Sequence, residues 1–107
     1  MKTSEILIKA RELIADPARW TQHANARDEE GISTNTFSEQ ATCWCSDGAL
    51  VKASNQPENH SEYQRAGDLL TEAARGQSYV EFNDTHTHAE VIAVFDTAIA
   101  TAQARGD

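Results

Sequence analysis

Apolar residues recur at helical spacing in four stretches of this chain, which predicts four amphipathic helices. The first stretch covers residues 4–15, with Ser4 as the N-cap and with the pair Asp16-Pro17 ending the helix. Trp20 follows as a large apolar anchor. The apolar face of this helix consists of Ile6, Ala10, Leu13 and Ile14.

The last stretch has the clearest helical pattern and covers residues 87–104. Thr87 and Glu90 stand at its start in the relation T-x-x-E. In such a capping box, the hydroxyl and the carboxylate accept hydrogen bonds from the first free amides of the helix. The inner stripe consists of Ile92, Phe95, Ile99 and Ala102.

Two further helices are predicted in the middle of the chain. One covers residues 36–53, with Thr36 and Glu39 as its capping box. The other begins at Ser61 with an S-x-x-Q box and stops at Gly76. The inner face of the first of these helices consists of Ala41, Trp44, Cys45, Gly48 and Val51.

The connections between these helices are irregular. Residues 21–35 lack helical periodicity and indicate a long loop, with one extended piece at 32–34. Residues 54–60 form a polar connector, and residues 78–82 alternate as a short strand that could pair with the extended piece. We therefore expect a mainly α fold, a compact four-helix single domain over residues 1–107, with a long loop and at most one two-stranded ribbon.

Composition narrows the class of protein. The chain has 107 residues, of which 39% are hydrophobic and 24% charged, as expected for a globular domain. Its formal charge of -8 argues against a nucleic-acid partner, because most of the surface would repel phosphates. No apolar run is long enough to span a membrane, and the polar N-terminus leads directly into a helix, so we expect a cytoplasmic protein without membrane contact.

The segment 83–91 holds the densest set of chemically active groups, including Asn83, Asp84, His88 and Glu90. Asn83 and Asp84 either stabilise a turn before the last helix or orient a neighbouring imidazole. His88 extends the inner stripe of that helix and points inward, either as a satisfied core histidine or as a base.

Cys45 is the candidate nucleophile that such a base could activate. A thiol, His88 and an orienting Asn83 or Asp84 are the residue types of a cysteine enzyme, whereas a buried cysteine is also a common small apolar residue. On a helix, Cys43 and Cys45 would lie about 200° apart and could not bridge each other, which favours free thiols. Their spacing also disfavours zinc, so we predict neither a metal nor a cofactor.

Four residues are candidates for ligand binding: Arg27, Asp28, Trp44 and Glu90. Arg27 could bind an anionic ligand bidentately, or it could anchor the long loop together with Asp28. Trp44 is either part of the core or a platform for a ligand, and Glu90 is either a helix cap or a ligand group. The free amides at the start of the last helix could also bind an anion.

Several short motifs in their order along the chain carry a resemblance. They are Trp20, Ala26-Arg27-Asp28, Trp44-Cys45 with Gly48-Ala49-Leu50, Asn83-Asp84, and Thr87-His88-Ala89-Glu90-Val91. Taken together, the chain resembles a family of small uncharacterised bacterial and phage proteins classed as a domain of unknown function. That family often carries an arginine before its Thr-His-Ala-Glu block, where this chain has His86. The resemblance implies the domain boundaries but no reaction.

The sequence therefore predicts a non-enzymatic interaction or regulatory module, whose partner would be a protein and whose oligomeric state is unknown. One alternative is a small enzyme with Cys45 as nucleophile and His88 as base. The other is a site for a small anionic ligand at the N-terminus of the last helix.

Overall fold

The computed structural model describes residues 1–55 and 57–107, and five α-helices carry its fold. A 3-10 turn and a small two-stranded sheet lie between the first two helices. The helices are α1 (Thr3–Leu13), α2 (Ser46–Ser54), α3 (His60–Ala73), α4 (Tyr79–Thr85) and α5 (His88–Ala104). The other elements are η1 (Pro17–Arg19), β1 (Ala26–Arg27) and β2 (Cys43–Trp44). The mainly α class is confirmed, but the prediction of four helices is wrong by one.

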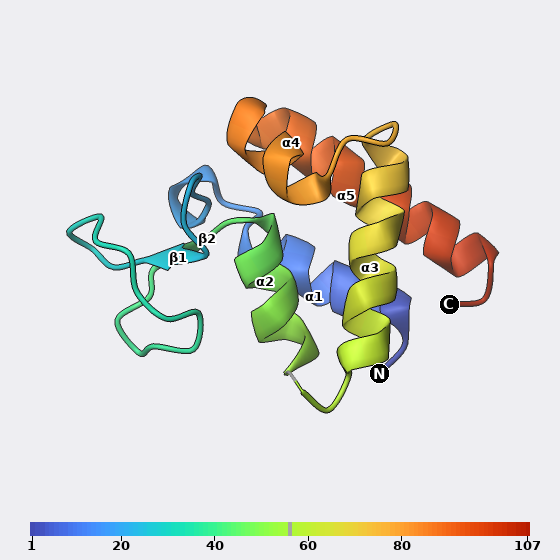
Figure 1. The fold of residues 1–107 in the computed structure, drawn as a ribbon, viewed down its shortest axis with the longest axis horizontal. Coiled ribbons are helices and arrows are strands. Elements are labelled where there is room, and N and C mark those ends of the chain that lie inside the picture. Colours follow the sequence, from blue (N-terminus) through green and yellow to red (C-terminus); the bar gives the residue numbers. More distant parts are fainter. Residues whose placement is uncertain (56) are drawn as a thin grey trace.

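The core lies where α1 packs against α2, α3 and α5 (Figure 1). Because α1 has neighbours on several sides, three of its apolar residues, Ile6, Leu7 and Ala10, are fully buried. Leu50 of α2, Leu70 of α3 and Phe95 of α5 complete the same cluster. The radius of gyration is 12.6 Å, close to the value expected for a compact chain of this length.

The first and last helices follow the sequence pattern. α5 begins at His88 with Thr87 as N-cap, and the predicted capping box with Glu90 is confirmed. α1 begins two residues earlier than its predicted N-cap would allow, because the Glu5 carboxylate accepts the Lys2 amide at 2.8 Å. The assignment of Ser4 as N-cap is therefore wrong.

The predicted helix over residues 36–53 is wrong in its first half. There the side chains of Asn35 and Ser38 accept backbone amides two residues ahead and form turns. Such local bonds compete with helical hydrogen bonds, so the predicted box of Thr36 and Glu39 does not form the start of a helix. The helix begins only at Ser46.

The predicted strand at residues 78–82 is a helix instead, α4. Tyr79, Phe82 and Asn83 have the spacing of one helix face, and all three are at least partly buried. The high strand propensity of Tyr79, Val80 and Phe82 is overridden by packing of α4 on α2, α3 and α5.

The third helix ends as predicted and begins one residue earlier. Gly76 has a φ of 91°, a left-handed conformation that favours glycine after a helix. The S-x-x-Q box at Ser61 is wrong, because Asn59 is the N-cap and makes no side-chain cap bond. Asn59 instead donates to the Ser54 carbonyl oxygen within the predicted connector 54–60, of which Gln56 lies outside the described residues.

A two-stranded ribbon is present, but with other strands than predicted. Ala26 pairs with Trp44 and Arg27 with Cys43, in antiparallel register. The extended piece at 32–34 contributes only a bridge from Ser33 to Arg27.

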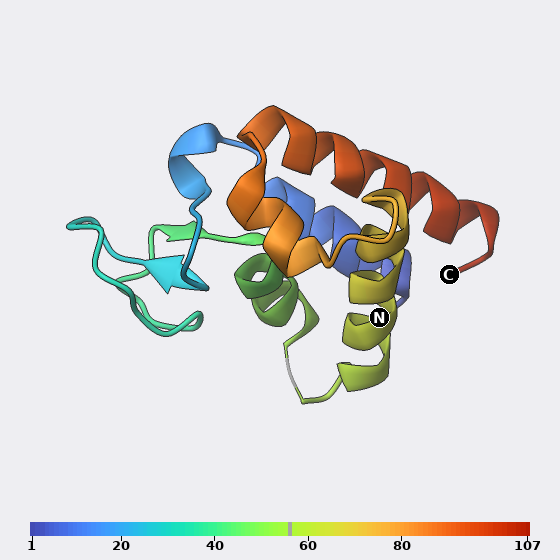
Figure 2. The ribbon, with the colours of Figure 1, turned by 45° about the horizontal axis from the view of Figure 1, so that its top comes forward.

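Residues 21–42, which we call the arm, project from the helical body together with β2 (Figures 1 and 2). The base of the arm is packed closely on α2. A Cβ atom at Gly48 would lie only 2.0 Å from the Asn25 carbonyl oxygen, so the residue facing Asn25 must be glycine. None of the helices in the described chain combines the length and the apolar character needed to cross a membrane.

Candidate functional site

Asn83 is the centre of the polar cluster at the end of α4, and its side chain is 1% exposed. Its amide oxygen accepts the Trp20 indole N–H at 2.8 Å, the Ser46 amide at 3.0 Å and the Ser46 hydroxyl at 2.9 Å. Its amide nitrogen donates to the Thr21 carbonyl and to the Asp84 carboxylate, both at 3.1 Å. Both ends of this buried amide are therefore satisfied.

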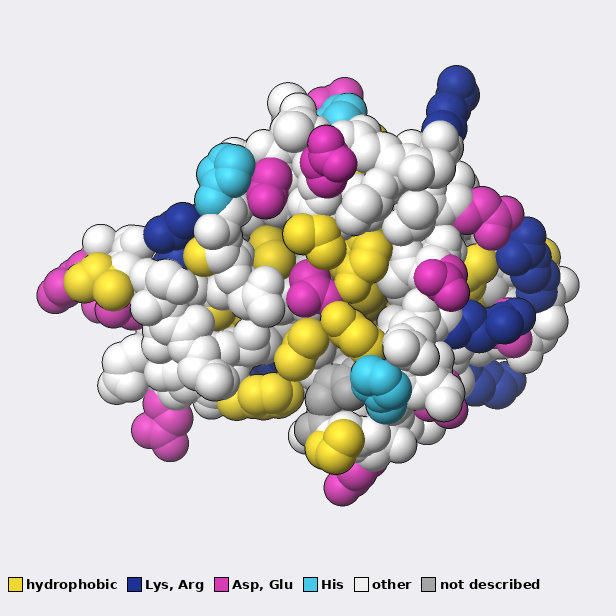
Figure 3. All heavy atoms as spheres, in the orientation of Figure 1, with side chains coloured by type: hydrophobic (Ala, Val, Ile, Leu, Met, Phe, Trp, Pro, Cys, Tyr) yellow, Lys and Arg dark blue, Asp and Glu magenta, His cyan; other side chains and the backbone are white. Residues whose placement is uncertain are grey.

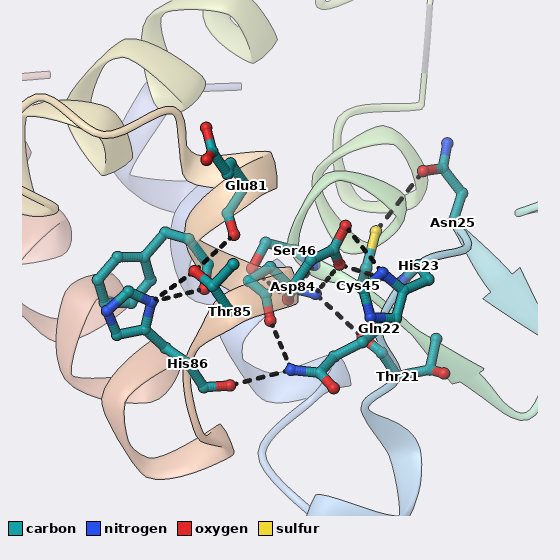
Figure 4. Close-up of polar contacts among 12 residues, drawn as sticks. Thr21, Gln22, His23, Asn25, Cys45, Ser46, Glu81, Asp84, Thr85 and His86 are labelled. Carbon is teal, nitrogen blue, oxygen red and sulfur yellow. Dashed lines mark hydrogen bonds and ion pairs between the residues drawn. The ribbon is translucent and has the colours of Figure 1, made fainter.

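Two more residues of the arm join the same cluster (Figure 4). Gln22 donates to the carbonyl oxygens of both Asn83 and His86 at 3.0 Å, which holds the arm against the end of α4. The Asp84 carboxylate accepts the His23 amide at 2.9 Å and lies 3.7 Å from the His23 ring. We call Trp20, Gln22, Ser46, Asn83 and Asp84 the latch, since they join the arm, α2 and α4.

Cys45 lies beside the latch but acts as the N-cap of α2. Its sulfur accepts the Gly48 amide at 3.3 Å, and its thiol donates to the Asn25 side-chain oxygen at 3.5 Å (Figure 4). The side chain is buried, and this burial raises the pKa of the Cys45 thiol above its ordinary value. Since the thiolate is the nucleophile, this environment lowers the reactivity that a catalytic cysteine needs.

His88 contacts groups other than Cys45. Its Nε2 atom lies 2.7 Å from the Ile14 carbonyl oxygen, just beyond the end of α1. Its ring meets the Trp20 indole edge to face, with 5.5 Å between centroids. These contacts join α5 to the ends of α1 and η1, and the described hydrogen bonds do not bring Cys45 and His88 together. The pairing of this nucleophile and base stays a prediction.

Arg27 and Asp28, two of the predicted ligand-binding residues, make their side-chain hydrogen bonds to other residues within the arm. The Arg27 guanidinium donates to the Thr21 hydroxyl and to the carbonyl oxygens of Gln22 and Gly31, at 3.0 to 3.1 Å. The Asp28 carboxylate accepts two backbone amides further along the loop, at 2.9 Å. The two side chains therefore stabilise the shape of the arm separately.

The Glu90 carboxylate is a negatively charged group at the N-terminus of α5. The Glu90 carboxylate accepts the Thr87 amide at 2.9 Å, and the Thr87 hydroxyl in turn accepts the Glu90 amide at 3.2 Å. The bonds from Thr87 lower the pKa of the Glu90 carboxyl. A bound anion would have to compete with this carboxylate for the Thr87 amide, and with the Thr87 hydroxyl for the Glu90 amide.

Trp44 is buried, with 3% of its surface exposed. Its indole N–H donates to the Thr36 carbonyl at 3.1 Å, which fixes the plane of the ring. Two cations, Arg19 and Lys52, each lie 5.4 Å from the ring centroid. Trp44 is thus a core residue whose ring also makes cation–π contacts with Arg19 and Lys52.

A second, partly buried polar contact has no signal in the sequence pattern. Tyr63 and Tyr79 both donate to one Asp47 carboxylate oxygen, at 2.6 and 2.5 Å, and so join α3 and α4 to the first turn of α2. Burial raises the pKa of both phenols, as does the neighbouring carboxylate.

The sequence pattern also gave no signal for Ser46 and Gln22 of the latch, because their partners are distant in sequence and neither residue type stands out.

No group of three or more His, Cys, Asp or Glu side chains within the described ranges could hold a metal ion.

A family model described as a family of unknown function, DUF6197, matches residues 1–101 of the chain. Searches of curated proteins and of solved structures give no match.

Proposed function

The chain belongs to DUF6197, a family of unknown function, and from the geometry of its arm and latch we propose that the protein is a non-enzymatic interaction module. The arm is its recognition surface, and the latch holds the arm in place. One observation carries the proposal: the arm is anchored at its base by partly buried hydrogen bonds, yet it exposes two large apolar side chains. Ile32 is 58% exposed and Phe37 is 47% exposed.

The anchoring matters because a rigid loop loses less conformational entropy when it binds. The arm receives hydrogen bonds from Arg27 at three points, and Gln22 and Trp20 tie its base to α4. Such internal order would give a partner a surface of fixed shape. Exposed aliphatic and aromatic side chains on such a surface are the residue types that anchor protein interfaces.

The charge of the arm indicates the chemistry of its partner. Acidic side chains surround a hollow of about 410 Å³ between the two loops of the arm, lined by Asp28, Glu29, Glu30, Glu39, Gln40 and Thr42. Hydrophobic atoms lie among acidic side chains at the tip (Figure 3). The partner is therefore a protein segment that offers Lys or Arg together with an apolar side chain.

Two further features support this proposal. The formal charge of -8 disfavours nucleic acid as the partner. Free thiols at Cys43 and Cys45 suit the reducing cytoplasm, where we place the protein.

Selection of peptides from a random displayed library, followed by NMR titration of one selected peptide, tests this function. We expect selected peptides to be enriched in Lys or Arg beside an apolar residue, and their chemical-shift changes to cluster in residues 28–42. Ile32→Ser and Phe37→Ser should each weaken binding roughly tenfold, as loss of an interface anchor does. Val80→Ser is the control, because Val80 is 42% exposed but lies on α4.

Selected peptides without basic residues, or shift changes centred outside the arm, would contradict the proposal. Light scattering supplies a further test. A dimer in solution that Ile32→Ser converts to monomer would identify a second copy, not a basic partner, as the occupant of this surface.

A further inference from the structure

A hollow of about 380 Å³ lies where α1, η1 and α2 meet, away from the acidic loops of the arm. Three elements contribute its lining. The lining residues are Lys9, Glu12, Leu13, Arg19, Lys52 and Ala53. Three of the nine Lys and Arg residues of an acidic chain therefore line one hollow.

The cations of this hollow form no ion pairs within the described part of the chain. The arginine ion pairs found there are those of Arg11, Arg65 and Arg105, and none of them involves a cation of the hollow. Glu12 contributes one carboxylate to the lining, and none of the ion pairs among the described residues joins it to these cations. Three cations and one carboxylate leave the lining with a formal charge of +2.

Two of these cations lie near the Trp44 ring. The Arg19 guanidinium and the Lys52 ammonium each lie 5.4 Å from the centroid of its ring, and a buried hydrogen bond to Thr36 holds the ring in place. The attraction of the ring for each cation offsets part of the repulsion between them. An anion bound near both cations would offset the repulsion that remains between them.

The turn that carries Arg19 is itself well defined. Pro17 stands at the first position of η1, and the Asp16 carboxylate accepts the Ala18 amide at 2.9 Å. A proline and a side-chain cap limit the conformations of this turn. Arg19 therefore extends from a fixed point toward the hollow.

From this arrangement we propose that the hollow binds a small organic phosphate. A phosphate monoester carries a charge near -2 at neutral pH, which matches the charge of the lining. Arg19 can donate two hydrogen bonds to phosphate oxygens, with Lys52 and Lys9 as further cations. Leu13 and Ala53 supply apolar surface for the organic part. This site is independent of the partner proposed for the arm.

The size and surroundings of the hollow favour a small ligand over a polymer. A nucleic acid would extend beyond the hollow onto a surface that carries the rest of the charge of -8. A small phosphate ester contacts only the local cations. Since Glu12 is the one anionic group of the lining, removing its carboxylate should strengthen binding.

NMR titration of the ¹⁵N-labelled protein with phenyl phosphate tests the proposal, at constant ionic strength set with chloride. The Trp44 ring centroid lies 5.4 Å from each of two cations of the hollow, and we expect the indole N–H signal of this residue to shift saturably. Arg19→Gln and Lys52→Gln should each weaken binding roughly tenfold, since each removes a charge-assisted contact. Glu12→Gln should strengthen it by a factor of a few.

Two controls separate this site from general charge effects. Arg65→Gln removes a cation that is paired with Asp107 outside the hollow, and it should leave the affinity unchanged. Benzyl alcohol, which has a similar ring without the phosphate, should not shift the Trp44 signal. Arg19→Lys keeps the charge and should retain part of the affinity, which excludes misfolding as the cause of a loss in Arg19→Gln.

Three results would overturn the proposal. The first is the absence of a saturable Trp44 shift with phenyl phosphate. The second is equal affinity in the wild type, Arg19→Gln and Lys52→Gln. The third is tighter binding of a single-stranded oligonucleotide than of phenyl phosphate at the same ionic strength, which would assign the hollow to nucleic acid.

Discussion

The side-chain oxygen of Asn83 accepts hydrogen bonds from both the backbone amide and the hydroxyl of Ser46, at 3.0 and 2.9 Å. These two residues are 37 positions apart in sequence. Their contact joins the end of α4 to the first residue of α2. The same oxygen binds the Trp20 indole, so one amide connects three segments of the chain.

Asn83→Ala should therefore lower the free energy of unfolding by about 3 kcal/mol, because it leaves several buried donors without an acceptor. Chemical denaturation measures this loss. Asn35→Ala is the matched control, since Asn35 is exposed and makes one local turn bond, and it should cost less than about 1 kcal/mol. Equal losses in the two variants would show that the latch does not stabilise the fold.

Gly48→Ala tests the close approach of the arm to α2. In an unobstructed helix, alanine in place of glycine adds about 0.5 to 1 kcal/mol of stability. Here the new Cβ would lie 2.0 Å from a backbone oxygen, so we expect a loss of about 2 kcal/mol or more. Thermal unfolding of wild type and Gly48→Ala shows whether the substitution raises or lowers the stability. Gly31→Ala is the comparison, since a Cβ atom there would have no neighbour within 4 Å and only the φ of 81° opposes alanine.

The Glu90 cap predicts a defined pH dependence. The folded state lowers the pKa of this carboxyl below its ordinary value of 4.5, because the Thr87 amide and hydroxyl bind the charged form. The stability from this cap is therefore complete above pH 4.5 and is lost as the pH falls through the lowered pKa. Glu90→Gln should lower the free energy of unfolding near neutral pH, with a difference from wild type that shrinks on acidification.

Denaturation curves of wild type and Glu90→Gln between neutral and acidic pH would measure this dependence. Glu81→Gln serves as the control, because it removes the same charge from an exposed position on α4. A difference for Glu90→Gln that stays constant with pH would show that the carboxylate does not act through its charged form.

The two thiols should differ in reactivity. Cys45 is 5% exposed and burial raises its thiol pKa, whereas Cys43 is only partly buried. Iodoacetamide at mildly alkaline pH should therefore modify Cys43 first, with Cys43→Ser and Cys45→Ser used to assign the products by mass spectrometry. Rapid alkylation of Cys45 below pH 7 would instead support the cysteine enzyme predicted with His88 as its base.

The sequence pattern predicted those parts of the fold whose causes are local. The capping box of Thr87 and Glu90 and the stop at Gly76 depend on residues within one helical turn, and both are present. It also singled out Asn83 and Arg27, although their roles follow from contacts that a sequence does not display. Residues such as Gln22 and Ser46 carried no signal.

The errors arise where distant contacts outweigh local preference. Residues 78–82 have high strand propensity, yet the Tyr79 hydroxyl reaches Asp47 across 32 positions and the segment packs as a helix. Trp44 has a helical position in the pattern, yet it pairs with Ala26 as a strand, and α2 starts after it.

The sequence by itself determined the mainly helical class, the positions of the first and last helices and the concentration of polar groups at 83–91. Periodicity and capping act within a few residues, so a linear pattern contains them. Only the tertiary structure decided that His88 contacts Ile14 and that Asn83 joins α2, α4 and the arm. Only the folded chain gathers Arg19 and Lys52 over Trp44, because the three residues lie on different elements and meet through packing.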